Sequence, residues 1–282
     1  MKISLETLPS LIEELSYSQN GSRHALEEEA FETFIALLDN GCIRAAEPEG
    51  GTWKVNAWVK KGILLGFKLG ELRRVAETGS FTYFDKHTYP LKNFSAGDNV
   101  RIVPGGSSVR RGAYLAPGVV LMPPSYINVG AHVGRGTMID SHVLIGSCAQ
   151  IGERNHISVA AQIGGVLEPV GSMPVIIEDN VMIGGNSGIF EGTIVRKGAV
   201  IGAGVLLTGS TPVYDCVHER IIAKSEAGTL EIPENAVVVS GSRNVDGAFA
   251  QAHGLNLYTP LIIKYRDAHT DARTALEDAL RQ

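Results

Sequence analysis

The sequence predicts a mainly β fold: a parallel β-helix of six-residue repeats with an N-terminal α-helical cap and a short C-terminal tail of one strand and one helix. The main observation is an aliphatic residue at every sixth position over most of the stretch from Val103 to Val213. A two-residue slip interrupts the series between Ile163 and Ile177, and no position in it is polar. Such a hexapeptide repeat is the signature of a parallel β-helix.

Two further observations support this fold. Small or modest side chains mostly occupy the fourth position after each aliphatic residue, and Gly often follows the aliphatic residue directly, as in Gly134 and Gly146. We expect each hexad to form one short strand and a corner, with Gly supplying corner conformations that a side chain would forbid. Three hexads then make one triangular coil, and about six coils stacked at roughly 4.8 Å give a prism about 30 Å tall. A β-sandwich is the alternative, but its strands alternate with a period of two residues. Crossover connections favour a right hand in general, so the pattern alone leaves the hand of the coil open.

Composition excludes several classes of function. The chain has 282 residues, 44% of them hydrophobic, and a net charge of −5, which argues against binding to the nucleic-acid phosphate backbone. Its three cysteines, Cys42, Cys148 and Cys216, are widely spaced and suggest neither a disulfide framework nor a zinc cluster. The first residues lack an apolar signal core, and no run approaches the length of a membrane span. We therefore expect a cytoplasmic protein with no nucleic-acid or membrane partner.

Residues 1–100 are predicted to form a helical or mixed domain that covers one end of the coil. Apolar residues at helical spacing predict helices over residues 3–18 and 24–40. The block from Thr52 to Phe67 begins with alternation and turns helical, and its two tryptophans are expected in the core. Residues 81–100 lead into the repeats.

Residues 101–250 are predicted to form the β-helix domain, and residues 251–282 the tail. The repeat is broken at residues 165–174 and again at 215–231, and two more hexads start at Ile232 and Val238. Loops that leave a repetitive scaffold commonly carry function. In the tail, residues 258–265 are predicted as a strand and residues 267–281 as a charged helix.

An ordered set of motifs then resembles one family, the bacterial 2,3,4,5-tetrahydropyridine-2,6-dicarboxylate N-succinyltransferases. The motifs span nearly the whole chain and are Trp53-Lys54-Val55-Asn56, Tyr83-Phe84-Asp85-Lys86, Arg101 to Pro104, Gly136-Thr137-Met138-Ile139-Asp140-Ser141, Gly146 to Gly152, Ile163 to Pro169, Ser210 to Asp215 and Val238-Val239-Ser240-Gly241. Hexads alone would be weak support, because many acyltransferases share them.

The resemblance implies a homotrimer of left-handed β-helices. It implies transfer of a succinyl group from succinyl-CoA to the amine of tetrahydrodipicolinate, or L-2-amino-6-oxopimelate, in diaminopimelate and lysine biosynthesis. Succinyl-CoA would be a co-substrate, and no permanently bound cofactor or metal is expected. The family is thought to use direct attack without an acyl-enzyme, so Cys148 is interpreted as structural.

Acyl transfer to an amine needs a base, donors for the oxyanion, and alignment of two substrates. Asp140 matches the family's substrate-binding aspartate, and its anionic oxygen would hold the substrate ammonium and assist its deprotonation. The alternative is a corner carboxylate that caps backbone N–H groups. Arg101 matches the family's substrate-binding arginine, which would grip a carboxylate of the acceptor; the alternative is an unpartnered surface residue.

The chain departs from the family pattern at one place. Better-known members have Ser-Glu-Val-Val-Glu-Gly where this chain has Ser187-Gly188-Ile189-Phe190-Glu191-Gly192, so a glutamate implicated in catalysis is replaced by Gly188. Glu191 is either the remaining catalytic partner or a solvated corner residue. The identity of the general base is therefore open.

CoA recognition in such trimers usually follows the groove between prisms. Ala149, Gly165 and Gly202 are candidate backbone neighbours of CoA, and Lys264 is a candidate partner of its phosphates, although each could equally be an ordinary structural or surface residue.

Other functions remain as alternatives. The acetyl-CoA-dependent tetrahydrodipicolinate N-acetyltransferase, or another hexapeptide-repeat acyl-CoA transferase, differs only in the group transferred. An acetyltransferase could use His142 or His156 as its base. A zinc hydrolase would need a histidine triad, but the spacings of His132, His142 and His156 argue against one. A non-catalytic solenoid that only binds partners would not require Arg101 and Asp140 together.

Overall fold

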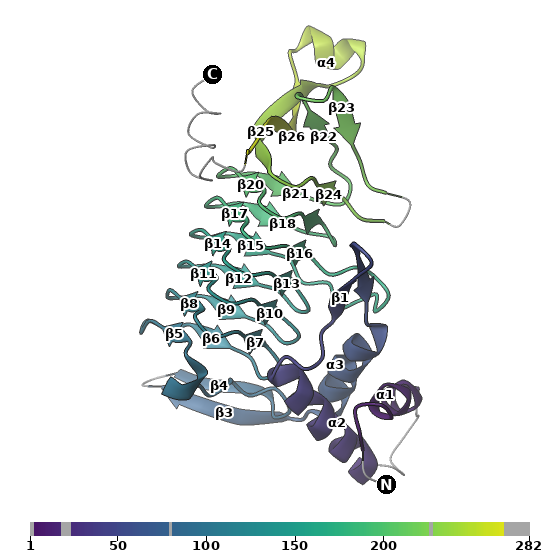
Figure 1. The fold of residues 1–282 in the computed structure, drawn as a ribbon, viewed down its shortest axis with the longest axis vertical. Coiled ribbons are helices and arrows are strands. Elements are labelled where there is room, and N and C mark those ends of the chain that lie inside the picture. Colours follow the sequence, from purple (N-terminus) through teal and green to yellow (C-terminus); the bar gives the residue numbers. More distant parts are fainter. Residues whose placement is uncertain (1–2, 18–23, 79–80, 226–227, 268–282) are drawn as a thin grey trace.

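The computed structural model describes residues 3–17, 24–78, 81–225 and 228–267, and its centre is a prism of three parallel sheets (Figure 1). Each strand pairs with the strands three places before and after it, so the chain visits the three sheets in turn. This connectivity is that of a three-sided parallel β-helix, as the hexads predicted.

We number the sheets in the order in which the chain visits them. Sheet I contains β5 (Arg101–Ile102), β8 (Val120–Leu121), β11 (Met138–Ile139), β14 (His156–Ile157), β17 (Met182–Ile183) and β20 (Val200–Ile201). Sheet II contains β6 (Ser108–Val109), β9 (Tyr126–Ile127), β12 (Leu144–Ile145), β15 (Gln162–Ile163), β18 (Gly188–Ile189) and β21 (Leu206–Leu207). Sheet III contains β7 (Tyr114–Leu115), β10 (His132–Val133), β13 (Gln150–Ile151), β16 (Ile176–Ile177), β19 (Ile194–Val195) and β24 (Glu231–Ile232).

The second residue of each strand points into the prism core, because successive side chains of a strand point to opposite faces, and buried corner residues such as Val119 and Val143 complete the core. The predicted series from Val109 to Val213 lies buried in this core without exception. The first position, Val103, was wrong: Ile102 takes the inward place and pairs with Leu121. Val109 comes seven positions after Ile102, one more than the repeat, because Pro104-Gly105-Gly106 lengthens the first corner.

The glycines of the repeat serve two separate purposes. Gly134 directly follows an inward residue, and a Cβ there would lie 2.5 Å from the backbone of Gly152 in the next coil. Gly136, two residues later, has a φ of 67°, in the left-handed region. The predicted role, an unusual backbone conformation, is therefore wrong for the glycines that directly follow the aliphatic residues, such as Gly134, which the close approach of two coils requires; glycines two positions further on, such as Gly136, have that conformation instead.

The N-terminal region has its own core, built from α1 (Leu8–Ser16), α2 (His24–Asp39) and α3 (Ala57–Leu69). The two predicted helices are confirmed with shorter bounds, and the block from Thr52 forms β2 (Thr52–Val55) followed by α3. β2 pairs with β1 (Ala46–Glu49). A second hairpin, β3 (Leu72–Thr78) and β4 (Phe81–Lys86), and the short 3₁₀ helix η1 (Ala96–Asp98) were not predicted.

This region packs along one corner of the prism as well as over its end. Val129 and Cys148, which lie at the corner between sheets II and III, belong to the N-terminal core. Figure 1 shows β1 beside the coils and the helices near the end formed by β5 to β7. Phe94 and Val100 pack against the end of the prism core, where no further coil pairs with it.

Both interruptions of the repeat leave from the corner between sheets II and III. The first joins β15 to β16 and the second joins β21 to β24. Lys60 of α3 anchors the first loop, since its Nζ donates a hydrogen bond to the Ser172 carbonyl oxygen at 2.5 Å. The second contains β22 (Val213–Asp215) and β23 (Arg220–Ile222), which form a hairpin.

The C-terminal region extends sheet I. β25 (Ala236–Asn244) pairs with β20 and then with β26 (Asn256–Tyr265), and the short helix α4 (Ala248–Ala252) lies between them. The predicted tail strand is confirmed and begins two residues earlier, whereas the predicted helix over residues 267–281 falls almost entirely outside the described residues. Within the described ranges, every helix falls short of the length and apolarity that crossing a membrane requires.

Candidate active site

A cavity of about 720 Å³ lies at the corner between sheets II and III, where the two loops that interrupt the repeat meet. Gly165 and Met173 line it from the first loop, Lys224 and Gly228 from the second, and Glu191 from the prism corner between them. The structure thus brings together two of the predicted site residues, Gly165 and Glu191. They occupy equivalent corner positions after β15 and β18, which are neighbours in sheet II.

Glu191 is held in an unusual corner. Its φ is 54° and that of Gly192 is 70°, so two successive residues adopt the left-handed conformation that L-residues rarely take. The Gly209 N–H donates a hydrogen bond to Glu191 Oε2 at 3.0 Å, which orients the exposed carboxylate. A carboxylate fixed in this way at a cavity can accept a proton or hold a cation.

Phe190 explains in part why this chain departs from the family pattern at Gly188. A Cβ on Gly188 would lie 2.3 Å from Phe190 Cε2, and the ring of Phe190 lines the cavity beside Glu191. The aromatic ring therefore occupies the space that a side chain at position 188 would need.

Lys224 was not predicted from the sequence. It lies in the second loop and gives the cavity a cationic side chain, next to two carboxylates, Glu168 and Glu191. The loop has no periodicity that could place its residues, so only its position as an interruption of the repeat pointed to a role.

Asp140 lies elsewhere on the chain, at the corner between sheets I and II, directly after β11. The Ser141 N–H donates a hydrogen bond to Asp140 Oδ1 at 2.8 Å, so the carboxylate caps its own corner, as the alternative interpretation foresaw. Gly202 follows β20 at the equivalent corner position, three coils away. Its carbonyl oxygen accepts a hydrogen bond from Ser187 Oγ at 2.8 Å.

Arg101 lies on β5, the first strand of sheet I, and its side chain is exposed. β5 pairs with β8 and β8 with β11, so two strand spacings, roughly 10 Å, separate the coils that carry Arg101 and Asp140. The two side chains are therefore carried by coils that are not adjacent.

The other predicted CoA contacts are scattered. Ala149 is completely buried in the prism core, its N–H bonded to the Gly146 carbonyl and its carbonyl accepting from the His132 N–H, so it offers no free polar group. Lys264 lies on β26 opposite Val237, at the far end of sheet I from Arg101. A Cβ on Gly165 would lie 2.5 Å from Ser147 N, so Ala149 and Gly165 lie at the same corner, whereas Lys264 and Gly202 lie two strands apart along sheet I. The four predicted CoA contacts therefore do not form one site in a single chain.

Cysteine and histidine placement bears on the alternatives. Cys148 is completely buried, and burial raises the pKa of its thiol to about 12, which confirms the structural interpretation because the thiolate is the nucleophile.

His132 lies on sheet III, His142 at the corner between sheets I and II, and His156 on sheet I. The three histidines of the zinc alternative are thus on different parts of the prism surface.

A coil of hexapeptide repeats, with a loop-lined cavity at a corner and carboxylates fixed at the corners, defines a protein of the hexapeptide-repeat transferase class. Residues 174–209 match the family described as the hexapeptide repeat of succinyl-transferase. Residues 7–69 match the family described as Tetrahydrodipicolinate N-succinyltransferase N-terminal.

The comparison with whole proteins goes further. The chain is 44% identical over 259 residues, 90% of its length and 89% of the relative, to the 2,3,4,5-tetrahydropyridine-2,6-dicarboxylate N-succinyltransferase of Methylobacterium sp. (strain 4-46). It is 42% identical over 261 residues to the enzyme of the same name from Acinetobacter baylyi, again with 90% and 89% coverage. The chain therefore belongs to the 2,3,4,5-tetrahydropyridine-2,6-dicarboxylate N-succinyltransferase family.

A solved structure supports the fold. A Campylobacter jejuni protein assigned as a 2,3,4,5-tetrahydropyridine-2-carboxylate N-succinyltransferase superposes with a TM-score of 0.50 at 16% identity, covering 83% of this chain and 62% of the other. At that identity the likeness concerns the fold alone.

Proposed function

We propose that the protein transfers the succinyl group of succinyl-CoA to the amine of tetrahydrodipicolinate, in its open form L-2-amino-6-oxopimelate, in diaminopimelate and lysine biosynthesis. The observation that carries this proposal is the similarity to enzymes of that name over 90% of the chain. Succinyl-CoA is a co-substrate that leaves as CoA.

The reaction needs a base and two aligned substrates. The substrate amine, once deprotonated, attacks the thioester carbonyl; the C–S bond breaks, an amide forms, and CoA leaves as the thiol with one proton. Glu191 or Asp140 can take the ammonium proton, since each is a carboxylate oriented by a backbone N–H. Arg101 is assigned to a carboxylate of the acceptor, where a guanidinium can form two parallel hydrogen bonds.

Lys224 supports succinyl over acetyl transfer. A succinyl group ends in a carboxylate that must be neutralised, and Lys224 is the cationic side chain of the cavity that Glu191 and Gly165 line. We expect Lys224→Gln to raise the KM for succinyl-CoA by about tenfold or more while acetyl-CoA, tested as an alternative donor, is unaffected. An equal effect on both donors would assign Lys224 to the CoA portion instead.

We also propose that the active site forms between the subunits of a homotrimer of left-handed coils. Asp140 and Glu191 lie at opposite edges of sheet II in one chain, so each needs a neighbouring copy to complete the site. A mixture of Asp140→Asn and Glu191→Gln chains tests this. Random mixed trimers would regain about a quarter of the active sites if the two carboxylates come from different chains, and none if they come from one chain.

The three free cysteines, two of them exposed, favour a reducing compartment and hence a cytoplasmic location. The reaction itself is tested by thiol release from succinyl-CoA or acetyl-CoA, with and without L-2-amino-6-oxopimelate. We expect acceptor-dependent release from succinyl-CoA. Release from acetyl-CoA alone would assign the protein to the acetyl-transferring branch, and no release from either would refute acyl transfer to this acceptor.

A further inference from the structure

A second cavity, of about 660 Å³, lies over sheet III, away from every residue assigned to acyl transfer. The β1–β2 hairpin covers it on one side through Pro48 and Trp53, together with Arg44 just before the hairpin, and the prism forms its other side through His132 and Arg135 among others. Of the residues that the structure describes, none lines both this cavity and the one beside Glu191, so the sheet III cavity is a separate site.

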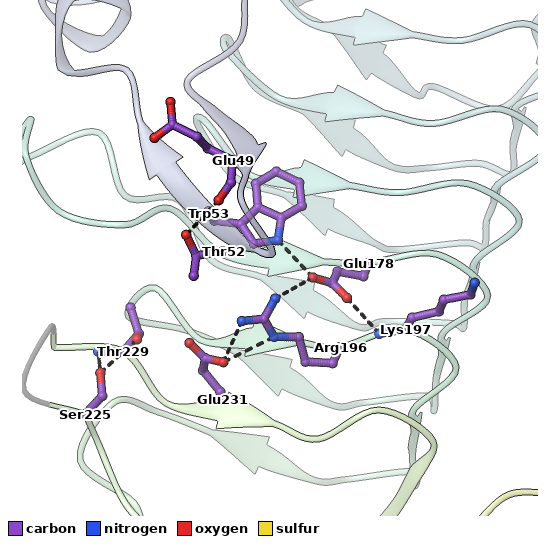
Figure 2. Close-up of polar contacts among 9 residues, drawn as sticks. All are labelled: Glu49, Thr52, Trp53, Glu178, Arg196, Lys197, Ser225, Thr229 and Glu231. Carbon is purple, nitrogen blue, oxygen red and sulfur yellow. Dashed lines mark hydrogen bonds and ion pairs between the residues drawn. The ribbon is translucent and has the colours of Figure 1, made fainter.

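The wall of this cavity is braced by a polar cluster (Figure 2). Trp53 Nε1 donates a hydrogen bond to Glu178 Oε1 at 2.9 Å, and Arg196 forms ion pairs with Glu178 at 2.8 Å and with Glu231 at 2.7 Å. Glu178 also accepts the Lys197 N–H at 3.0 Å. These bonds fix the indole of Trp53 against the prism, where it packs on Ile176 and Ile194.

Most carboxylates at this cavity are already neutralised. Glu178 is engaged as described, Glu153 pairs with Arg154 at 2.6 Å, and Asp179 Oδ2 lies 3.9 Å from the same guanidinium. Glu234 is the remaining carboxylate of the lining.

Two cationic side chains of the cavity, Arg44 and Arg135, have fewer ion-pair partners than its carboxylates. The half-buried Arg44 donates its Nε–H to Gln150 Oε1 at 2.9 Å and lies over the Trp53 ring at 5.7 Å, but no carboxylate of the described ranges forms an ion pair with it. Burial lowers the pKa of Arg44 and outweighs the opposing effect of the negative charges of Glu47 and Asp179, neither of which forms an ion pair with it. Arg135 is exposed and, among the described side chains, has no ion-pair partner either.

His132 adds an unsatisfied polar atom. Its Nδ1 is buried without a hydrogen-bond partner, and its ring packs against Tyr114 at 4.8 Å. Burial, with a smaller contribution from Arg44, lowers the pKa of His132 to about 3, so the imidazole is neutral at pH 7 and can present an N–H at Nδ1. A buried group of this kind without a partner calls for an explanation.

We propose that the sheet III cavity binds a small molecule through an oxyanion, a carboxylate or a phosphate, which Arg44 and Arg135 hold. Such a ligand would supply the missing ion-pair partner of the two guanidinium groups. Trp53 and Tyr114 offer flat surfaces for the rest of the molecule, which the volume of the cavity accommodates. This inference does not rest on the proposed acyl transfer.

Trp53 provides the assay, because the chain has only two tryptophans. The other, Trp58, packs edge-on against Phe34 in the N-terminal core, so Trp58→Phe leaves a single fluorophore at the cavity. Inorganic phosphate, succinate and CoA are titrated separately at constant ionic strength. We expect a saturable change in Trp53 fluorescence with at least one probe, half-complete below about 10 mM. Saturation by succinate alone would indicate a carboxylate ligand, and saturation by phosphate or CoA a phosphate ligand.

Arg44→Gln should weaken the binding about ten- to hundredfold, because a charge-assisted hydrogen bond is lost. The matched control is Arg73→Gln, which removes an equal charge from an exposed arginine that pairs with Glu71 outside the cavity and should leave binding unchanged. If Arg44→Gln unfolds in a thermal melt, the exposed Arg135→Gln replaces it. No saturable change with any probe up to about 50 mM, or the same affinity in the cavity variant and in the control, would overturn the proposal.

Discussion

Gly188→Ala tests whether Phe190 controls the candidate active site. The added Cβ would lie 2.3 Å from Phe190 Cε2 and 2.9 Å from Leu206 Cδ2, whereas ordinary contacts begin at 3.4 Å. The ring of Phe190 must therefore move by about 1 Å or more, and it can do so only within the cavity that it lines beside Glu191. A misplacement of about 1 Å can cost about 10²-fold in rate. We expect kcat to fall about 10- to 100-fold, with a loss of about 1–3 kcal/mol in the free energy of unfolding.

The assay is acceptor-dependent thiol release from succinyl-CoA, with thermal unfolding measured on the same samples. The double variant Gly188→Ala/Phe190→Ala removes the displaced ring and should recover most of kcat. Gly136→Ala is the control: its φ of 67° makes Ala unfavourable by about 1 kcal/mol, but its nearest neighbour would be Arg154 Cγ at 3.8 Å. It should lose stability and keep its kcat. The reasoning is refuted if Gly188→Ala keeps full activity, or if removing the Phe190 ring restores none.

Three further predictions concern single side chains. Asp140→Asn should reduce thiol release by about 10²-fold or more with little change in melting temperature, because Asn can still accept the Ser141 N–H; unchanged kinetics would remove Asp140 from the mechanism. Arg101→Ala should raise the KM for the acceptor about tenfold or more and leave CoA binding alone, and an equal loss of both would indicate a collapsed first coil. Burial opposes the ionisation of Asp215, but hydrogen bonds from Tyr265, His218 and Arg220 outweigh it and lower its pKa to about 2. The stabilisation is therefore complete above the unfolded-state pKa near 4 and is lost as the pH falls toward 2, so Tyr265→Phe should move the midpoint of acid unfolding, followed by circular dichroism, to higher pH; an unmoved midpoint would contradict this.

The repeat region was predictable because a six-residue period is compatible with few folds and fixes which side chains point inward. Its one error, Val103, arose where Pro104-Gly105-Gly106 adds a residue to the first corner. At the first coil, no earlier repeat is available in the sequence from which the register could be checked. The β3–β4 hairpin was missed for a different reason. Leu72 is 73% exposed and Phe84 65% exposed, so the hairpin buries little and lacks the apolar alternation that reveals a strand.

The candidate site was predictable in part. The corner position of Glu191 and the loop position of Gly165 follow from the repeat, and both do line one cavity. Lys224 could not be predicted, because a loop without periodicity does not show which of its residues turns toward the prism. The sheet III cavity was also beyond sequence reasoning: Arg44 and His132 are 88 positions apart, one in the N-terminal region and the other on the prism. Only the packing of the β1–β2 hairpin on sheet III brings them to one cavity.

The corner between sheets II and III carries most of the non-repetitive structure: the N-terminal core packs on it at Val129 and Cys148, and both loops leave from it. The β1–β2 hairpin covers part of sheet III through Trp53. Sheets I and II are therefore the faces left for a neighbouring subunit, and they bear partly exposed apolar side chains such as Met138 and Leu206. Asp140 lies at the corner between these two sheets, so an adjacent chain that docks there would bring its own Glu191 corner within reach. The separation of the two carboxylates in one chain thus becomes an argument for the proposed trimer.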